Sequence, residues 1–205
     1  MTQGPGPAGT VVALAPAPQD MKRLGAALAR VLGPGDTVLL GGDLGAGKTT
    51  FTQGLASALG VSGPVTSPTF VLLHSYPTSA GWALLHADVW RLDQLQEVID
   101  LAIPELLEDG AVAVVEWGEQ AAPALAADCL HVAIDFVVAG PPSAPAPDVL
   151  TATPGTTPAT PGTTPATPGT TPPAPDAGGT RRVVFRPLGP SWDRRMAALA
   201  SAVGT

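Results

Sequence analysis

At 205 residues with a net charge of −7, the chain is long enough for one domain and short for two of ordinary size. It has no apolar run near the ~20 residues that span a bilayer, no leader pattern in residues 1–9 and a single cysteine, Cys129, so we expect a cytoplasmic protein without an internal disulfide. The first 140 residues hold 14 acidic and 5 basic side chains, which argues against tight, direct binding of nucleic acid.

The N-terminal quarter alternates strand and helix patterns. Short apolar runs predict strands at Val11–Leu14 and Thr37–Leu40, and helical patterns follow each of them at Asp20–Leu32 and Lys48–Leu59. Asp20 is a residue type that favours the N-cap position, so we expect the first helix to begin there. Elements that alternate in this way indicate an α/β domain built on a central sheet.

Three further strands are expected in the middle of the chain, at Phe70–Tyr76, Ala83–Ala87 and Ala111–Glu116. Helical composition extends from Gln94 to Glu108 between the last two. With the N-terminal elements, they complete a sheet flanked by helices of the P-loop NTPase type.

The C-terminal region contains a repeat of seven residues, Thr-Pro-Gly-Thr-Thr-Pro-Ala, which starts at Thr153. Because the repeat has no large apolar side chain to bury, we predict that residues 141–179 form a disordered linker. Strand-like runs flank it at Leu130–Phe136 and Arg181–Pro187, and they predict an antiparallel hairpin with an expanded connection. With a last helix at Trp192–Val203, a single domain would comprise residues 10–140 and 180–205.

A phosphate-binding loop is predicted between the second strand and its helix. Residues 42–49 match G-x-x-x-x-G-K-[ST], and the pattern sits where its mechanism requires, after a strand and before a helix. Glycines let backbone amides close around phosphates, Lys48 reaches the β and γ oxygens, and the Thr49 hydroxyl can ligate magnesium. The residues expected to bind ATP are Asp43, Leu44, Gly45, Ala46, Gly47, Lys48, Thr49 and Thr50.

A P-loop also needs an acidic partner on a neighbouring strand. Asp88 and Glu116 each follow a strand pattern, so we predict Asp88 as the magnesium-side carboxylate and Glu116 as the group that acts on the attacking water. Thr49, Asp88 and Glu116 together are the expected magnesium site. The hydroxyls of Ser67 and Thr69 either sense the γ-phosphate or simply cap a turn, and the pattern does not decide between these.

Four segments together resemble the TsaE family of bacterial ATPases for tRNA threonylcarbamoyladenosine biosynthesis. They are Gly-Asp-Leu-Gly-Ala-Gly-Lys-Thr-Thr-Phe from position 42, Ser-Pro-Thr-Phe from 67, His-Ala-Asp-Val-Trp-Arg-Leu from 86 and Val-Glu-Trp-Gly-Glu from 115. The resemblance implies an ATPase that works with the TsaB and TsaD proteins and whose hydrolysis resets their complex between turnovers. It also implies catalytic roles for Lys48, Asp88, Glu116 and Trp117. The long linker is a departure from the family's short hairpin.

The main alternative is a small P-loop kinase. Kinases of this kind clamp phosphates with several arginines, whereas Arg91 is the only Lys or Arg between Lys48 and Arg181. A nucleotide-dependent binding module without hydrolysis is a second alternative. The three histidines, His74, His86 and His131, do not form a zinc pattern and are expected to be structural.

Overall fold

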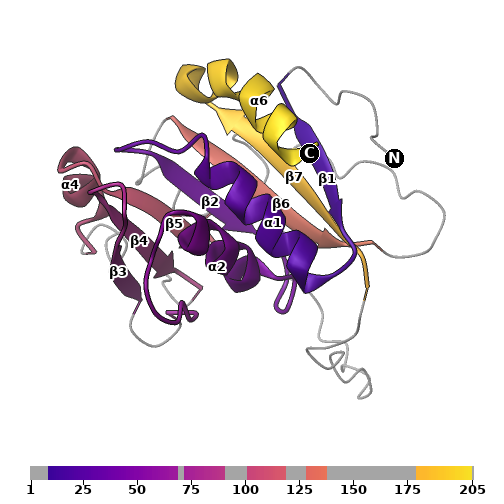
Figure 1. Cartoon of the computed structure of the whole chain (residues 1–205), viewed down its shortest axis with the longest axis horizontal. Coiled ribbons are helices and arrows are strands. Elements are labelled where there is room, and N and C mark those ends of the chain that lie inside the picture. Colours follow the sequence, from indigo (N-terminus) through magenta and orange to yellow (C-terminus); the bar gives the residue numbers. More distant parts are fainter. Residues whose placement is uncertain (1–8, 69–71, 91–100, 119–127, 138–178, 205) are drawn as a thin grey trace, which may run out of the picture. The chain divides into compact units, whose positions relative to one another are not determined.

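The computed structural model of the chain describes residues 9–68, 72–90, 101–118, 128–137 and 179–204 (Figure 1). All of these residues belong to one compact unit. The predicted linker, residues 141–179, lies outside the described residues except for Gly179, so the prediction of disorder and the domain bounds remain predictions. None of the helices in the described ranges is long and apolar enough to cross a membrane.

A seven-stranded sheet runs through the described residues, in the order β1-β7-β6-β2-β5-β4-β3. Its four central strands, β6, β2, β5 and β4, are parallel, and antiparallel strands complete both edges. In chain order the strands are β1 (Val11–Ala15), β2 (Thr37–Gly41), β3 (Leu73–Pro77), β4 (Ala83–Asp88), β5 (Val112–Glu116), β6 (Cys129–Phe136) and β7 (Arg181–Leu188).

The strands at the centre are the most buried. Every residue of β2 and of β5 is buried, and their sequences, TVLLG and VAVVE, are continuous runs without the polar alternation of a half-exposed strand. Such runs are typical of parallel strands that are covered on both faces. The carboxyl ends of β2, β5 and β4 therefore lie together at one end of the buried central sheet.

Helices cover both faces of this sheet. α1 (Pro18–Ala29), α2 (Lys48–Ala58) and α6 (Pro190–Val203) contribute to the larger core cluster, through Leu28, Phe51 and Trp192 among others, and Figure 1 shows α1 and α2 in front of the sheet. α4 (Ile103–Glu108) packs into a second cluster on the other face with Leu39 and Val115. Within the described ranges, α1, α2 and α6 thus cover one face of the sheet and α4 packs on the other.

Two glycines bring α1 and α2 into backbone contact. A Cβ atom at Gly25 would lie 2.1 Å from the Phe51 carbonyl oxygen, and one at Gly54 would lie 2.1 Å from the Lys22 carbonyl oxygen. Any larger side chain must push the helices apart, because backbone atoms cannot rotate away as a side chain does. The position of α2, which begins at Lys48, therefore depends on this close crossing.

The α/β class, the sheet flanked by helices and the antiparallel C-terminal hairpin are confirmed. β6 pairs with β7 from Cys129 opposite Leu188 to Phe136 opposite Arg181. The predicted strand Phe70–Tyr76 begins three residues later, at Leu73, and residues 69–71 lie outside the described ranges. The helix predicted over 94–108 is observed only as α4, with residues 91–100 likewise outside them.

The expected start of the first helix was wrong by two residues. α1 begins at Pro18, and Asp20 is its third residue, where its carboxylate accepts a hydrogen bond from the Ala17 backbone N–H at 3.1 Å. Proline favours the first turn because its missing N–H would have no partner there. Asp20 therefore stabilises the helix from inside the first turn and not from the N-cap.

Candidate nucleotide-binding site

The loop between β2 and α2 has the backbone that its glycines allow. Gly42 has φ 127° and Gly47, the N-cap of α2, has φ 111°, values that side chains other than glycine rarely tolerate. A Cβ atom at Gly42 would also lie 2.2 Å from the Ile134 carbonyl oxygen of β6. The loop thus lies tightly against the sheet, with the positive end of the α2 dipole at its mouth.

Lys48, the first residue of α2, folds back over this loop. Its ammonium group donates hydrogen bonds to the carbonyl oxygens of Gly42 at 2.7 Å and Asp43 at 3.0 Å. Only 5% of the residue is exposed, whereas Leu44 at the tip of the loop is 86% exposed. The positive charge is therefore held inside the cradle that the loop encloses.

Two tryptophans lie beside the lysine. The Trp117 ring centroid is 3.7 Å from the Lys48 ammonium, and the Trp90 ring packs against Trp117 with centroids 4.3 Å apart and the ring planes tilted by 46°. Trp117 has φ 60°, and its backbone N–H donates to the Leu40 carbonyl at 2.8 Å, which fixes it to the end of β2. Because Trp90 is 58% exposed, this aromatic pair connects the buried cation with the surface.

Glu116, at the end of β5, joins the loop to the neighbouring strand β4. Its Oε1 atom accepts a hydrogen bond from the Thr49 hydroxyl at 2.8 Å and lies 2.9 Å from His86 Nε2. The parallel register places Glu116 beside Leu40 on one side and Asp88 on the other. The carboxylate is buried, and the hydroxyl that was predicted to ligate magnesium is half-buried.

Asp88, at the end of β4, has a different set of contacts. Its two oxygens accept hydrogen bonds from the Ser67 hydroxyl at 3.3 Å and from the Trp90 backbone N–H at 3.0 Å. Ser67 belongs to the hydroxyl-rich turn of the sequence, and Thr69 of that turn lies outside the described residues. The two acids thus occupy adjacent strand ends, and the one that contacts Thr49 is Glu116.

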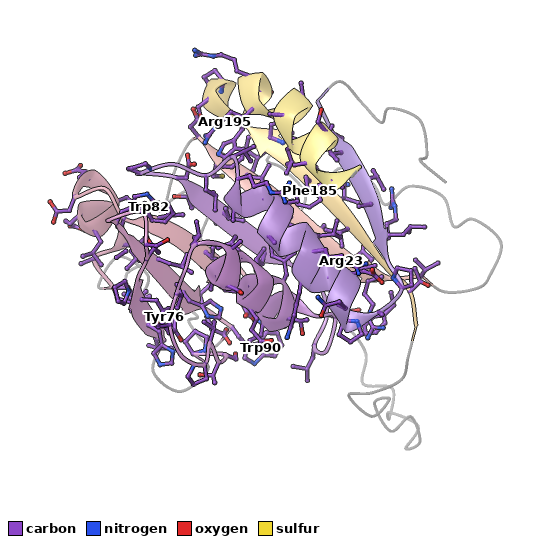
Figure 2. The ribbon with its side chains drawn as sticks, viewed as in Figure 1. Arg23, Tyr76, Trp82, Trp90, Phe185 and Arg195 are labelled. Atoms are coloured by element: carbon purple, nitrogen blue, oxygen red, sulfur yellow. The ribbon has the colours of Figure 1, made fainter. Side chains whose placement is uncertain are left out.

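The predicted site residues therefore come together at one end of the sheet. Lys48, Thr49, Asp88, Glu116 and Trp117 are linked by direct contacts or adjacent register across β2, β5 and β4 and the start of α2. Figure 2 labels Trp90 at this end, below α2 in the view.

The sequence matches the family model described as threonylcarbamoyl adenosine biosynthesis protein TsaE over residues 15–138. The chain belongs to the TsaE family. Curated members of the family named tRNA threonylcarbamoyladenosine biosynthesis protein TsaE include one from Streptomyces coelicolor, 48% identical over 58% of this chain and 80% of its own length. The match to the Mycobacterium tuberculosis protein is 45% identical over 60% of this chain and 77% of that one. The match to the Bacillus subtilis protein is 38% identical over 57% of this chain and 72% of that one.

The fold agrees with that of a solved structure. The crystal structure of Bacillus subtilis YdiB superposes with a TM-score of 0.59, covering 95% of this chain and 94% of that chain at 24% identity. The TsaE match ends just after β6, so β7 and α6 lie beyond it. All four segments that carried the resemblance lie inside the matched residues.

In this TsaE-family chain, sequence reasoning did not predict the contact of His86 with Glu116. His86 was expected to be structural; it is fully buried, with Nε2 against Glu116. The alternation of a strand contained the signal, because side chains two residues apart lie on the same face, and His86 is two residues before Asp88. His74, directly opposite His86 on β3, pairs instead with the Tyr76 hydroxyl at 3.1 Å.

Oxygen atoms dominate the groups available to a cation here. Magnesium prefers oxygen ligands and is usually bound through one or two carboxylates together with substrate phosphates, so Thr49, Glu116 and Asp88 suit it. No cluster of three or more His, Cys, Asp or Glu side chains suited to a metal is found within the described residues.

Cys129 is buried away from this site. Its burial, and to a smaller extent the charge of Asp128, raise the pKa of its thiol, and a raised pKa is typical of a structural cysteine.

Proposed function

We propose that this chain is a magnesium-dependent cytoplasmic ATPase that serves threonylcarbamoyladenosine modification of tRNA together with the TsaB and TsaD proteins. Membership of the TsaE family supports the pathway, since the curated relatives are named for it. The observation that carries the ATPase proposal is the glycine loop at the end of β2, with Lys48 inside it and Thr49 bonded to Glu116. The TsaB and TsaD partners come from the resemblance of the sequence segments.

The loop and α2 would bind the phosphates of ATP. Backbone N–H groups at the start of α2 and the helix dipole favour negative charge there, and the Lys48 ammonium would exchange its carbonyl contacts for the β and γ oxygens. Because the lysine is already held in the loop, little side-chain freedom is lost on binding. Trp117, against the same ammonium, would limit access of water to that charge.

Thr49 and Glu116 would hold magnesium, which would neutralise the negative charge that develops on the phosphates in transfer. The direct contact between these two residues supports this assignment, and it reverses the division of roles that the sequence predicted. Asp88 would orient or deprotonate the attacking water, since its carboxylate is held in place by Ser67 and the Trp90 backbone. In this proposal Thr49, Asp88 and Glu116 all remain members of the magnesium site that the sequence predicts.

Lys48→Ala tests the ATPase proposal. We expect ATP hydrolysis to fall by about 10² to 10³, because a preorganised positive charge at the γ-phosphate is lost, while the melting temperature changes little. Lys22→Ala, at the only other lysine of the chain, is the matched control and should hydrolyse ATP as the wild type does. Equal hydrolysis by Lys48→Ala and wild type would refute the proposal.

The partner proposal needs a separate measurement. Between Lys48 and Arg181 the sequence has a single arginine, Arg91, so we expect slow hydrolysis by the chain alone. An arginine supplied by a partner raises such rates by roughly 10³ to 10⁵. Adding TsaB and TsaD should therefore stimulate hydrolysis, and ATP should change their recovery with the tagged chain. Fast hydrolysis that TsaB and TsaD do not alter would contradict this part.

A further inference from the structure

We infer that His86 is a positioning residue for the magnesium-binding carboxylate, which it holds through a hydrogen bond from Nε2 to Glu116. The inference rests on the proposed function, because it assigns His86 a part in a site where Thr49 and Glu116 hold the metal. Three observations carry it: the buried contact at 2.9 Å, the second hydrogen bond to the same oxygen, and a ring nitrogen for which the described part of the chain offers no partner.

The position of the ring determines which way the hydrogen bond runs. His86 is fully buried, and Nδ1 has no hydrogen-bond partner among the described residues, while Nε2 faces a carboxylate oxygen. A proton on Nδ1 would leave a buried donor without an acceptor, which costs roughly 1–3 kcal/mol. A proton on Nε2 instead satisfies the Glu116 oxygen and leaves only a lone pair unpaired. The arrangement therefore favours His86 donating from Nε2.

Both hydrogen bonds that Glu116 accepts through its side chain end on Oε1. One comes from Thr49 on α2 and the other from His86 on β4, so the carboxylate is held between the first turn of α2 and the neighbouring strand. A glutamate side chain has three rotatable bonds, and holding it in one rotamer costs conformational entropy. Because His86 supplies part of that restraint from the sheet, the carboxylate is preorganised for the cation.

A structural explanation of the same contact is weaker. A histidine that served only to fill the core would be replaced at lower cost by an apolar side chain, since the ring leaves one buried nitrogen unsatisfied. The neighbours Leu84 and Leu85 show that β4 accommodates leucine in fully buried positions. Leaving Nδ1 unsatisfied lowers the stability of the fold, and the contact of Nε2 with Glu116 explains why a histidine is nevertheless found at this position.

Three substitutions at one position separate positioning from packing. His86→Leu removes the donor and keeps an apolar side chain, and His86→Asn keeps a polar amide too short to reach the Nε2 position. His86→Gln places an amide N–H near that position. Hydrogen bonds to metal-ligating groups are typically worth 10- to 100-fold in metal affinity or activity. We expect Leu and Asn to weaken magnesium-dependent nucleotide binding by at least about tenfold and Gln to restore most of it.

The measurement is the affinity for a fluorescent ATP analogue, with magnesium and again with EDTA. The phosphate contacts of Lys48 and the loop do not involve His86, so the affinity for the analogue in EDTA should be equal in all variants. Only the increase in affinity on adding magnesium should be smaller, in His86→Leu and His86→Asn. In a Glu116→Gln background, His86→Leu should cause no further loss, because His86 acts through that carboxylate.

Each outcome separates the two proposals. If the wild type binds no nucleotide, or gains nothing from magnesium, the proposed function fails. If the wild type gains affinity from magnesium and both His86→Asn and His86→Leu gain as much, the positioning role of His86 is overturned. Equal losses in EDTA and in magnesium would also overturn it, since packing alone would explain them. Should His86→Leu not fold, the comparison of His86→Asn with His86→Gln decides.

Discussion

Two polar clusters tie helices to the same sheet, and they differ in how fully their atoms are paired. In the anchor cluster, Arg195 of α6 makes a bidentate ion pair with Asp36 at 2.6 and 2.8 Å and also donates to Ser191 and to the Val31 carbonyl. The Arg195 guanidinium also lies over the Trp192 ring, 3.9 Å from its centroid. Figure 2 labels Arg195 beside α6, far from Trp90 in the view.

The site cluster of Thr49, His86 and Glu116 is more buried but less complete. Within the ranges that the structure describes, His86 Nδ1 has no partner, and the two side-chain hydrogen bonds of Glu116 end on one oxygen. Asp36, by contrast, accepts at both oxygens and also from the Gly33 backbone N–H at 2.7 Å. The difference indicates that the anchor cluster serves stability, whereas the site cluster keeps acceptor capacity for a ligand.

The largest effect should come from the acids of the site. Asp88→Asn is expected to lower the rate of ATP hydrolysis by about 10² to 10³ at saturating magnesium, because the group that acts on water is lost. Glu116→Gln should raise the magnesium concentration for half-maximal rate, because a charged ligand becomes neutral. Magnesium titrations of both variants check this, and a shifted midpoint in Asp88→Asn alone would restore the roles predicted from the sequence.

The helix crossing gives the next largest effect, on stability. Gly54→Ala should lower the free energy of unfolding by about 3 kcal/mol, because its Cβ would lie 2.1 Å from the Lys22 carbonyl oxygen. Gly33→Ala is the matched control, since no atom lies within 4 Å of its Cβ, and it should be neutral or slightly stabilising. Urea denaturation of both variants measures the difference, and equal unfolding midpoints would contradict the close crossing.

Breaking the anchor cluster should cost somewhat less. Arg195→Ala is expected to lower the free energy of unfolding by about 2 kcal/mol, because the buried Asp36 is left without its cation. Arg194→Ala, at the exposed neighbouring position, should change stability by less than about 0.5 kcal/mol. Neither variant should alter ATP hydrolysis once folded. Loss of hydrolysis in folded Arg195→Ala would remove the distinction between the two clusters.

The local elements of this molecule were predictable, and the contacts between them were only partly so. The strand Thr37–Leu40, the loop and the start of α2 at Lys48 follow from apolar runs and glycine positions that lie next to each other in the chain. The contact of Thr49 with Glu116 spans 67 positions and depends on β5 lying beside β2. Nothing in the spacing specifies that strand order, so the sequence did not predict the contact between Thr49 and Glu116, and the assignment of Asp88 to the magnesium side stays a prediction.

The smallest effect should follow from shortening the β6–β7 connection. The Val137 backbone N–H donates to the Thr180 carbonyl at 2.9 Å, so the two strand ends are already adjacent. Replacing residues 141–179 by a turn of about five residues should leave hydrolysis unchanged and raise stability by up to about 2 kcal/mol, since loop closure costs less. Thermal melts and hydrolysis assays check this. A shortened chain that fails to fold would show that the segment contributes to packing.

The antiparallel pairing of β6 with β7 also has a consequence for how the chain can be divided. β7 and α6 supply Val183, Phe185, Trp192 and Leu199 to the larger core cluster, yet they join the rest of the chain only through the segment after β6. Cleavage of that segment would leave two pieces that share eight registered residue pairs between β6 and β7, five more between β1 and β7, and one apolar core. Residues 1–137 and 178–205 are thus suited to expression as the two pieces of a split protein. The larger piece would carry the whole phosphate loop, but its stability would depend on binding the smaller piece.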